Sequence, residues 1–186
     1  MSNISAVKKQ LSFKVQTAAA LAAVAAAVVI PQIFHIFGAV LGVGTSLGET
    51  FLPMHIPIIL VGLLAGPYAG AAAGLLGPLA SFVLTGMPTS FMLPFIMIEL
   101  CTYGLAAGLI KDINIPSIFK VILVQLSGRI IRSIMVLISV YVFGNMTVKV
   151  SSVWMSIVTG IGGIILQWIV IPLIIYGIEK LKKDEN

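Results

Sequence analysis

The chain has 186 residues, of which 59% are hydrophobic and 9% are charged, and its mean hydropathy is +1.14. Soluble globular domains carry about 25% charged residues, so this composition excludes a soluble fold and predicts a protein embedded in the lipid bilayer. The formal net charge is +5. The basic residues gather at the chain ends and in one loop, where membrane topology explains them, and we expect no nucleic-acid partner.

Six apolar segments follow one another along the chain. A helix that crosses the hydrocarbon core needs roughly 20 apolar residues. Breaks at glycine, proline and charged residues place the expected spans at about 15–37, 49–66, 67–85, 91–110, 117–143 and 153–179. They use nearly the whole length, so residues 1–186 are predicted to form a single all-α membrane domain.

The first expected span is rich in alanine. It imitates a secretory signal, but it runs on to Phe37, beyond the length of a signal's apolar region, so we expect it to be retained. It carries two adjacent rows of alanines with a spacing of four residues: Ala18, Ala22 and Ala26, beside Ala19, Ala23 and Ala27. Small residues at this spacing let another helix approach closely. This face either packs inside the protein or docks a second membrane protein.

Two prolines interrupt the start of the second span, in Leu52-Pro53-Met54-His55-Ile56-Pro57. Irregular backbone is tolerated in a membrane only against protein or a wet cavity, so a ligand site is expected here. His55 is a candidate ligand contact, although a structural role is also open. Glu49, at the start of the same segment, is a further candidate contact. Three more candidates for the wall of this site are also compatible with core packing: Met54, Met87 and Tyr103.

Glycine organises the middle of the chain. Gly66 can end one helix and Pro67 can begin the next at its first position, which predicts a tight helical hairpin. Small residues also recur four apart in Gly62-Gly66, Gly70-Gly74 and Gly104-Gly108. We expect most of these stripes to pack the protein's own helices.

Three ionisable residues lie inside the later spans: Glu99, Arg129 and Arg132. A charge in lipid costs at least about 2.5 to 3.5 kcal/mol, so these side chains should face the protein interior. Glu99 lies about 12 Å, Arg132 about 15 Å and Arg129 about 20 Å below the outer helix ends, so Glu99 and Arg132 can meet. The remaining cation either bonds to backbone carbonyls, Gln125 or Gln167, or receives an anionic group of a substrate.

The lysines outside the spans predict the orientation. Lys149 lies alone on one side of a six-helix topology, and eight lysines lie on the other: Lys8, Lys9, Lys14, Lys111, Lys120, Lys180, Lys182 and Lys183. Basic residues favour the cytoplasm, so both termini are expected there. The outer side then holds the first loop, residues 38–48, and the turns at Met87 and Gly144.

No catalytic motif is present in the sequence. It lacks a phosphate-binding glycine-rich loop, a His-Glu-x-x-His motif and a Gly-x-Ser-x-Gly motif, and Cys101 is its single cysteine. We therefore expect no enzyme, no metal site and no cofactor. Uphill transport would need an ion gradient or an energy-coupling partner. Two alternatives are a stand-alone carrier or channel for a small anionic metabolite and, more remotely, a membrane-embedded enzyme.

These features resemble the S component of an energy-coupling factor (ECF) transporter, the vitamin-capture subunit of a bacterial ABC-type importer. The branch that the sequence is most similar to includes folate, pantothenate and cobalamin S components. The resemblance covers nearly the whole chain. It rests on the six spans, the basic N-terminus, the row Ala18-x3-Ala22-x3-Ala26, the long first outer loop, and the string Leu52 to Pro57 followed by Gly62-Leu63-Leu64-Ala65-Gly66-Pro67.

The resemblance implies a mechanism in the bacterial cell membrane. An S component binds a vitamin from outside, docks on a transmembrane coupling subunit carried by two cytoplasmic ATPases, and tips over to release the vitamin inward. Ala18, Ala22 and Ala26 would form the docking face, and the first loop and the Met87 turn would act as lids. The candidate ligand contacts would be His55, Glu99, Arg129 and Arg132, and the spare arginine favours pantothenate or folate.

Overall fold

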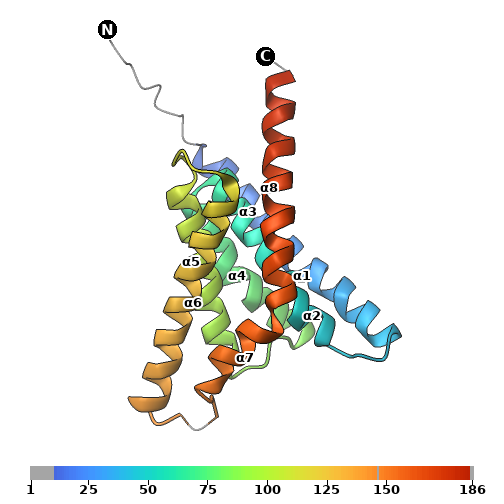
Figure 1. The fold of residues 1–186 in the computed structure, drawn as a ribbon, viewed down its shortest axis with the longest axis vertical. Helices are drawn as coiled ribbons and strands as arrows, with labels where there is room; N and C mark the ends of the chain where they lie inside the picture. Colours follow the sequence, from blue (N-terminus) through green and yellow to red (C-terminus); the bar gives the residue numbers. More distant parts are fainter. Residues whose placement is uncertain (1–10, 146, 185–186) are drawn as a thin grey trace.

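The computed structural model describes residues 11–145 and 147–184, and every regular element in them is an α-helix (Figure 1). The helices are α1 (Phe13–Val40), α2 (Ser46–Phe51), α3 (His55–Ala65), α4 (Pro67–Thr85), α5 (Leu93–Ile110), α6 (Ser117–Tyr141), α7 (Ser151–Thr159) and α8 (Ile161–Asp184). Lys8 and Lys9 of the expected basic N-terminus lie outside the described residues, as do the side chains of Lys182 and Lys183.

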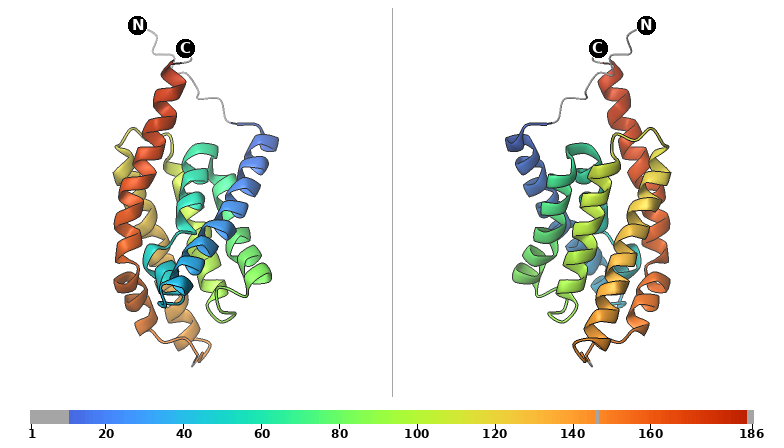
Figure 2. Two further views of the ribbon diagram at one scale, coloured as in Figure 1. Left: turned by 90° about the vertical axis from the view of Figure 1, so that its right-hand side faces the viewer. Right: turned by 90° about the vertical axis from the view of Figure 1, so that its left-hand side faces the viewer.

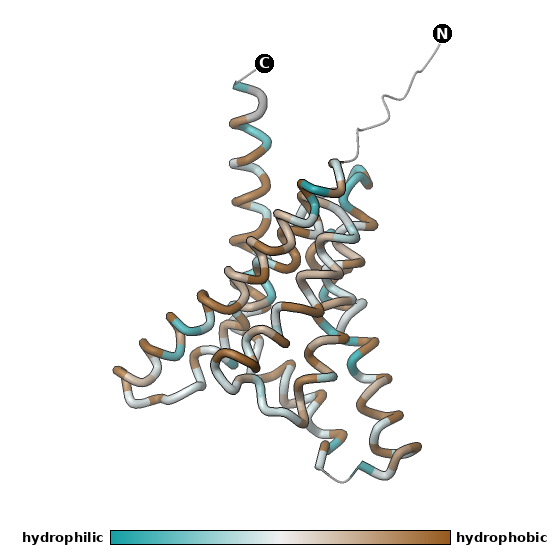
Figure 3. Tube along the Cα trace, turned by 180° about the vertical axis from the view of Figure 1, so that it is seen from behind, coloured by the Kyte–Doolittle hydropathy of each residue, from teal (hydrophilic) through white to brown (hydrophobic). Residues whose placement is uncertain are grey.

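Six segments are long and apolar enough to cross a membrane: Phe13–Val40, Ser46–Ala65, Pro67–Thr85, Leu93–Ile110, Ser117–Tyr141 and Ile161–Leu181. Apolar residues accordingly run along the length of the helices (Figure 3). The all-α membrane class and the six expected spans are confirmed. The unit is a multi-pass membrane protein.

Two expected boundaries are wrong. The last span, expected at 153–179, divides at Gly160 into α7 and α8. Gly160 ends α7 and packs closely on Leu52. A Cβ added to Gly160 would lie 2.7 Å from the Leu52 Cδ1 atom. The first loop, expected at 38–48, is shorter because α1 continues to Val40 and α2 begins at Ser46. Gly42 and Gly44 make this turn with φ angles of 72° and 59°, a backbone region that glycine adopts without steric cost.

The centre of the bundle is built from α3, α4 and α5, which are held together by glycine. Gly66 has a φ angle of 114° and precedes the first residue of α4, so the predicted hairpin is confirmed. A Cβ on Gly62 would lie 2.5 Å from the Gly104 carbonyl oxygen, and a Cβ on Gly70 would collide with the Gly104 backbone. These glycine stripes pack the protein's own helices, as expected.

The other helices surround this centre (Figures 1 and 2). α1 crosses it at a tilt, α6 packs on α5, and α8 lies against α6. The start of α1 and the end of α8 lie at one end of the bundle (Figure 2). The opposite end, here called the α2–α7 end, holds α2, α7 and the connection between α4 and α5.

The two alanine rows of α1 lie in different environments. Ala23 and Ala27 are buried, with exposed fractions of 7% and 0%. In the neighbouring row, Ala18 and Ala22 are exposed and Ala26 is half-buried. One row therefore packs α1 onto the bundle, while the other leaves a smooth surface facing outward.

Candidate functional site

A cavity of about 180 Å³ lies at the α2–α7 end of the bundle. Its walls come from α1, α2, α3, α4 and α5 and from the turns between them. They are mostly apolar, and the lining residues are Pro31, His35, Gly48, Glu49, Leu52, Pro53, Met54, His55, Ser81, Met87, Pro88 and Ile96. Four of the expected site residues, Glu49, Met54, His55 and Met87, therefore share one cavity.

The cavity depends on the irregular backbone that the prolines predicted. α2 stops at Phe51, Leu52 adopts a left-handed φ of 47°, and α3 begins only at His55. A left-handed non-glycine residue is uncommon, and it turns the chain so that the end of α2 and the start of α3 both contribute to the wall. Leu52 also accepts a hydrogen bond from the His55 backbone N–H at 3.1 Å, which fixes the start of α3.

Two histidines supply polar atoms to this apolar cavity. The Nδ1 atoms of His35 and His55 are both buried and have no hydrogen-bond partner among the described residues. Buried polar atoms normally have a partner, so both imidazoles are suited to bonding a ligand. Glu49 is more exposed, and its Oε1 atom accepts a hydrogen bond from the Thr45 hydroxyl at 3.2 Å.

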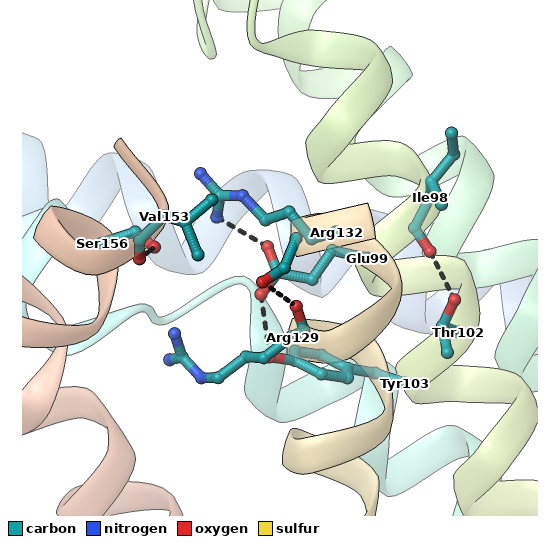
Figure 4. Close-up of polar contacts among 9 residues, drawn as sticks. Ile98, Glu99, Thr102, Tyr103, Arg129, Arg132, Val153 and Ser156 are labelled. Carbon is teal, nitrogen blue, oxygen red and sulfur yellow. Dashed lines mark hydrogen bonds and ion pairs between the residues drawn. The ribbon is translucent and has the colours of Figure 1, made fainter. Parts of the chain in front are cut away.

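The second group of expected residues lies around Glu99, which is 1% exposed. The Arg132 Nη1 atom donates to Glu99 Oε2 at 2.7 Å, and the Tyr103 hydroxyl donates to Glu99 Oε1 at 2.9 Å (Figure 4). Gly128 makes this approach possible, because a Cβ there would collide with the Tyr103 ring and lie 2.9 Å from the Glu99 carbonyl oxygen. The expected pairing of Glu99 with Arg132 is therefore present.

Arg129 is the cation left over. In the part of the chain that the structure describes, no hydrogen bond or ion pair joins its guanidinium to another residue. The guanidinium points away from Glu99 (Figure 4). Gln125 and Gln167 do not satisfy it: the Gln125 amide donates to Gln167 at 2.8 Å and accepts from the Trp168 indole at 2.7 Å.

The two groups are neighbours. The rings of His55 and Tyr103 lie with their centroids 5.5 Å apart, so these side chains stand between the cavity and the Glu99 ion pair. The space beside the arginines is lined by Glu99, Arg129, Arg132, Val153, Ser156 and Ile157, and it is too narrow to admit a water molecule. In this conformation α7 covers the arginines, and the histidine-lined cavity is separate from the space beside them.

Sequence reasoning missed several lining residues, above all His35 and Ser81. His35 is one of only two histidines in the chain, and a polar residue in the outer half of the first span was the signal that could have identified it. Ser81 carries no such signal, because a serine is common inside membrane helices. Among the described residues, no group of three or more His, Cys, Asp or Glu side chains could hold a metal ion.

Six spans with a polar cluster buried among them define a multi-pass membrane protein. The sequence model of the family described as "ECF transporter, substrate-specific component" matches residues 14–175, and the chain belongs to this family. No curated protein and no solved structure matches the chain. Members of this family are substrate-specific subunits of ECF importers rather than enzymes. Membership implies a small-molecule substrate and partnership with the ECF coupling and ATPase components.

Proposed function

We propose that this protein captures a carboxylate-bearing, water-soluble vitamin, with pantothenate and folate as the first candidates. The α2–α7 end faces the exterior of a bacterial cell, and the vitamin is received there. The observation that carries this proposal is the guanidinium of Arg129, which has no partner among the described residues, beside a neutralised Glu99–Arg132 pair.

The net charge of Glu99, Arg129 and Arg132 supports an anionic ligand. Glu99 offers one negative charge to two guanidiniums, and Arg132 occupies one of its oxygens at 2.7 Å. An unpaired charge in a membrane span is costly, and the planar guanidinium fork suits a carboxylate. A carboxylate that bonds to Arg129 would bring the net charge of the cluster to zero.

The cavity supports a site that widens when ligand enters. Its volume of about 180 Å³ is below the roughly 300 Å³ at which sites for drug-sized ligands begin. A vitamin would occupy the histidine-lined cavity with its uncharged part and reach Arg129 with its carboxylate. This requires the His55 and Tyr103 rings, or α7, to move aside.

The orientation rests on the lysines and on the shared location of the helix ends. α1 begins and α8 ends at the same end of the bundle (Figure 2), which is compatible with both termini in the cytoplasm. Lys14, Lys111, Lys120 and Lys180 belong to that half of the topology, and Lys149 to the other. The positive-inside rule then places the cavity at the outer face of the bacterial plasma membrane.

The exposed alanine row supports docking through α1. Ala18 and Ala22 are exposed while their neighbours Ala23 and Ala27 are buried. α1 therefore presents a face without large side chains at these positions, where a helix of the coupling subunit can pack closely. Two cytoplasmic ATPases on that subunit would supply the energy.

The decisive test is binding of radiolabelled pantothenate and folate to the purified protein and to the Arg129→Gln variant. We expect one of these vitamins to bind wild type, and Arg129→Gln to weaken its binding about 10- to 100-fold, because a charge-assisted hydrogen bond contributes about 1.5 to 3 kcal/mol. Lys149→Gln removes a cation from the exposed loop and serves as the matched control. Equal affinities of all three proteins would contradict the role of Arg129. Uptake by cells that lack the ECF coupling and ATPase components would favour a stand-alone carrier.

A further inference from the structure

A row of three hydrogen-bonded side chains joins α6 to α8 within the membrane-spanning part of both helices. The Trp168 indole N–H donates to Gln125 Oε1 at 2.7 Å, and Gln125 Nε2 donates to Gln167 Oε1 at 2.8 Å. Both glutamines are buried, and Gln167 is only 1% exposed. We call the side chains of Gln125, Gln167 and Trp168 the amide relay.

The indole of Trp168 determines how both amides are oriented. An indole N–H can only donate, so the Gln125 atom that faces it must be the amide oxygen. The Gln125 amide nitrogen then faces Gln167, whose oxygen must accept. The atom left at the end of the relay is therefore Gln167 Nε2, which is a donor. This atom is buried and has no hydrogen-bond partner among the described residues, although buried polar atoms normally have one.

Arg129 lies one helical turn from Gln125 of the relay. The two residues are four apart on α6 and share a face, with Arg129 about 6 Å closer to the α2–α7 end. α6 runs toward that end and α8 runs away from it (Figure 1). Helical side chains lean toward the N-terminus of their own helix. Arg129 therefore leans toward the relay, and Gln167 leans toward Arg129.

Two groups that can only donate thus face the same region. A guanidinium has no acceptor atom, and neither has the amide nitrogen of Gln167, so the two cannot bond to each other. Neither finds an acceptor among the described residues. A carboxylate has two oxygens and can accept from both groups at once. An ammonium group would be rejected here, because it offers no acceptor and carries the same charge as Arg129.

We propose that Arg129 and Gln167 together form a carboxylate subsite between α6 and α8. Gln167 Nε2 donates to one carboxylate oxygen and the Arg129 guanidinium to the other. Trp168 and Gln125 are positioning residues, because they hold the Gln167 donor toward the subsite without contacting the ligand. The inference rests on the proposed function and deepens it. It adds a second ligand contact and places the carboxylate on the side of Arg129 that faces away from Glu99.

The first test supplies the missing acceptor without any ligand. Gln167→Glu keeps the shape of the side chain and an oxygen that accepts from Gln125, and it places a second carboxylate oxygen opposite Arg129. This variant should keep or raise the temperature of thermal unfolding in detergent. The same change in an Arg129→Gln background should lower that temperature by at least about 5 °C, because the buried carboxylate then has no cation.

Gln32→Glu is the matched control for this test. The Gln32 amide nitrogen is also buried without a partner among the described residues, but it belongs to α1, whereas Arg129 belongs to α6. Gln32→Glu should lower the unfolding temperature equally with and without Arg129. Equal destabilisation by Gln167→Glu in the two backgrounds would overturn the proposal, because it would show that Gln167 and Arg129 do not face each other.

The second test separates a ligand contact from a structural role. Gln167→Leu removes the donor and keeps a side chain of similar size. It should weaken binding of radiolabelled pantothenate or folate about 10-fold or more, and it should change far less the binding of the analogue in which alcohols replace the carboxylates. Equal losses for the vitamin and its analogue would indicate a structural role and overturn the proposal. If neither vitamin binds wild type while the effect of Gln167→Glu still depends on Arg129, the vitamin assignment fails and the carboxylate subsite stands.

Discussion

Arg129 and Arg132 are one helical turn apart on α6 and yet lie in different electrostatic environments. Arg132 reaches Glu99 at 2.7 Å, and the Tyr103 hydroxyl occupies the other carboxylate oxygen at 2.9 Å. Each carboxylate oxygen of Glu99 therefore already accepts a hydrogen bond from a residue other than Arg129. The structure thereby separates an arginine paired with Glu99 from one that has no partner among the described residues, whereas the sequence predicts only that one of the two is in excess.

Removing Arg132 should therefore damage folding more than removing Arg129. Arg132→Ala leaves Glu99 buried without its charge partner, which costs about 3 to 5 kcal/mol in buried pairs. Arg129→Ala breaks no hydrogen bond or ion pair of the described residues and should change thermal stability little. Thermal unfolding of both variants in detergent measures the difference. Adding Glu99→Gln to Arg132→Ala should recover part of the lost stability, and equal unfolding temperatures for the two single variants would contradict this division.

At the scale of the helices, small residues spaced four apart are buried in some rows and exposed in another. The glycines of α3, α4 and α5 are buried against one another, and the Ala23 and Ala27 row of α1 is buried in the same way. The Ala18 and Ala22 row of the same helix is exposed. A four-residue repeat thus predicts a close helix contact but does not say whether the second helix belongs to this chain.

Tryptophan substitutions in the two rows should have opposite effects. Ala22→Trp places a large ring on the exposed row, so it should abolish ECF-dependent uptake and leave vitamin binding by the isolated protein intact. Ala23→Trp inserts the same ring into the buried row and should reduce folded protein, because overpacking a close contact is destabilising. Uptake in cells, binding by purified protein and size-exclusion profiles measure these effects. Loss of binding in Ala22→Trp would argue against a docking face.

At the scale of the whole molecule, α3, α4 and α5 form a centre on which α1 and α6 pack, and the short helices α2 and α7 lie at one end of the bundle. α2 and α7 are short helices at one end, and both cover parts of the candidate site. Ligand-binding segments are commonly drawn from the less stable parts of a fold. In this chain the two short helices, α2 and α7, lie at the α2–α7 end, and the close glycine packing of α3, α4 and α5 lies between the two ends.

The orientation can be measured with single cysteines in a Cys101→Ala background. Lys149→Cys should react with an impermeant maleimide added to intact cells, because the loop before α7 is proposed to face outward. Lys180→Cys should react only after the cells are opened, since basic residues favour the cytoplasm. The reverse labelling pattern would place the cavity inside and would contradict capture from the exterior.

The sequence by itself determined the membrane class, the six spans, the Gly66-Pro67 hairpin and the irregular backbone before His55. These follow from hydropathy and from the backbone limits of glycine and proline, which act locally. It also predicted which ionisable residues would be buried together, because lipid forces such residues inward.

Only the tertiary structure decided which arginine pairs with Glu99, which alanine row faces outward, and that His35 and Ser81 join His55 around one cavity. It also divided the last span at Gly160, where α8 meets α2. Each of these depends on contacts between segments far apart in the chain, and neither the hydropathy nor the spacing of residues within one helix contains that information.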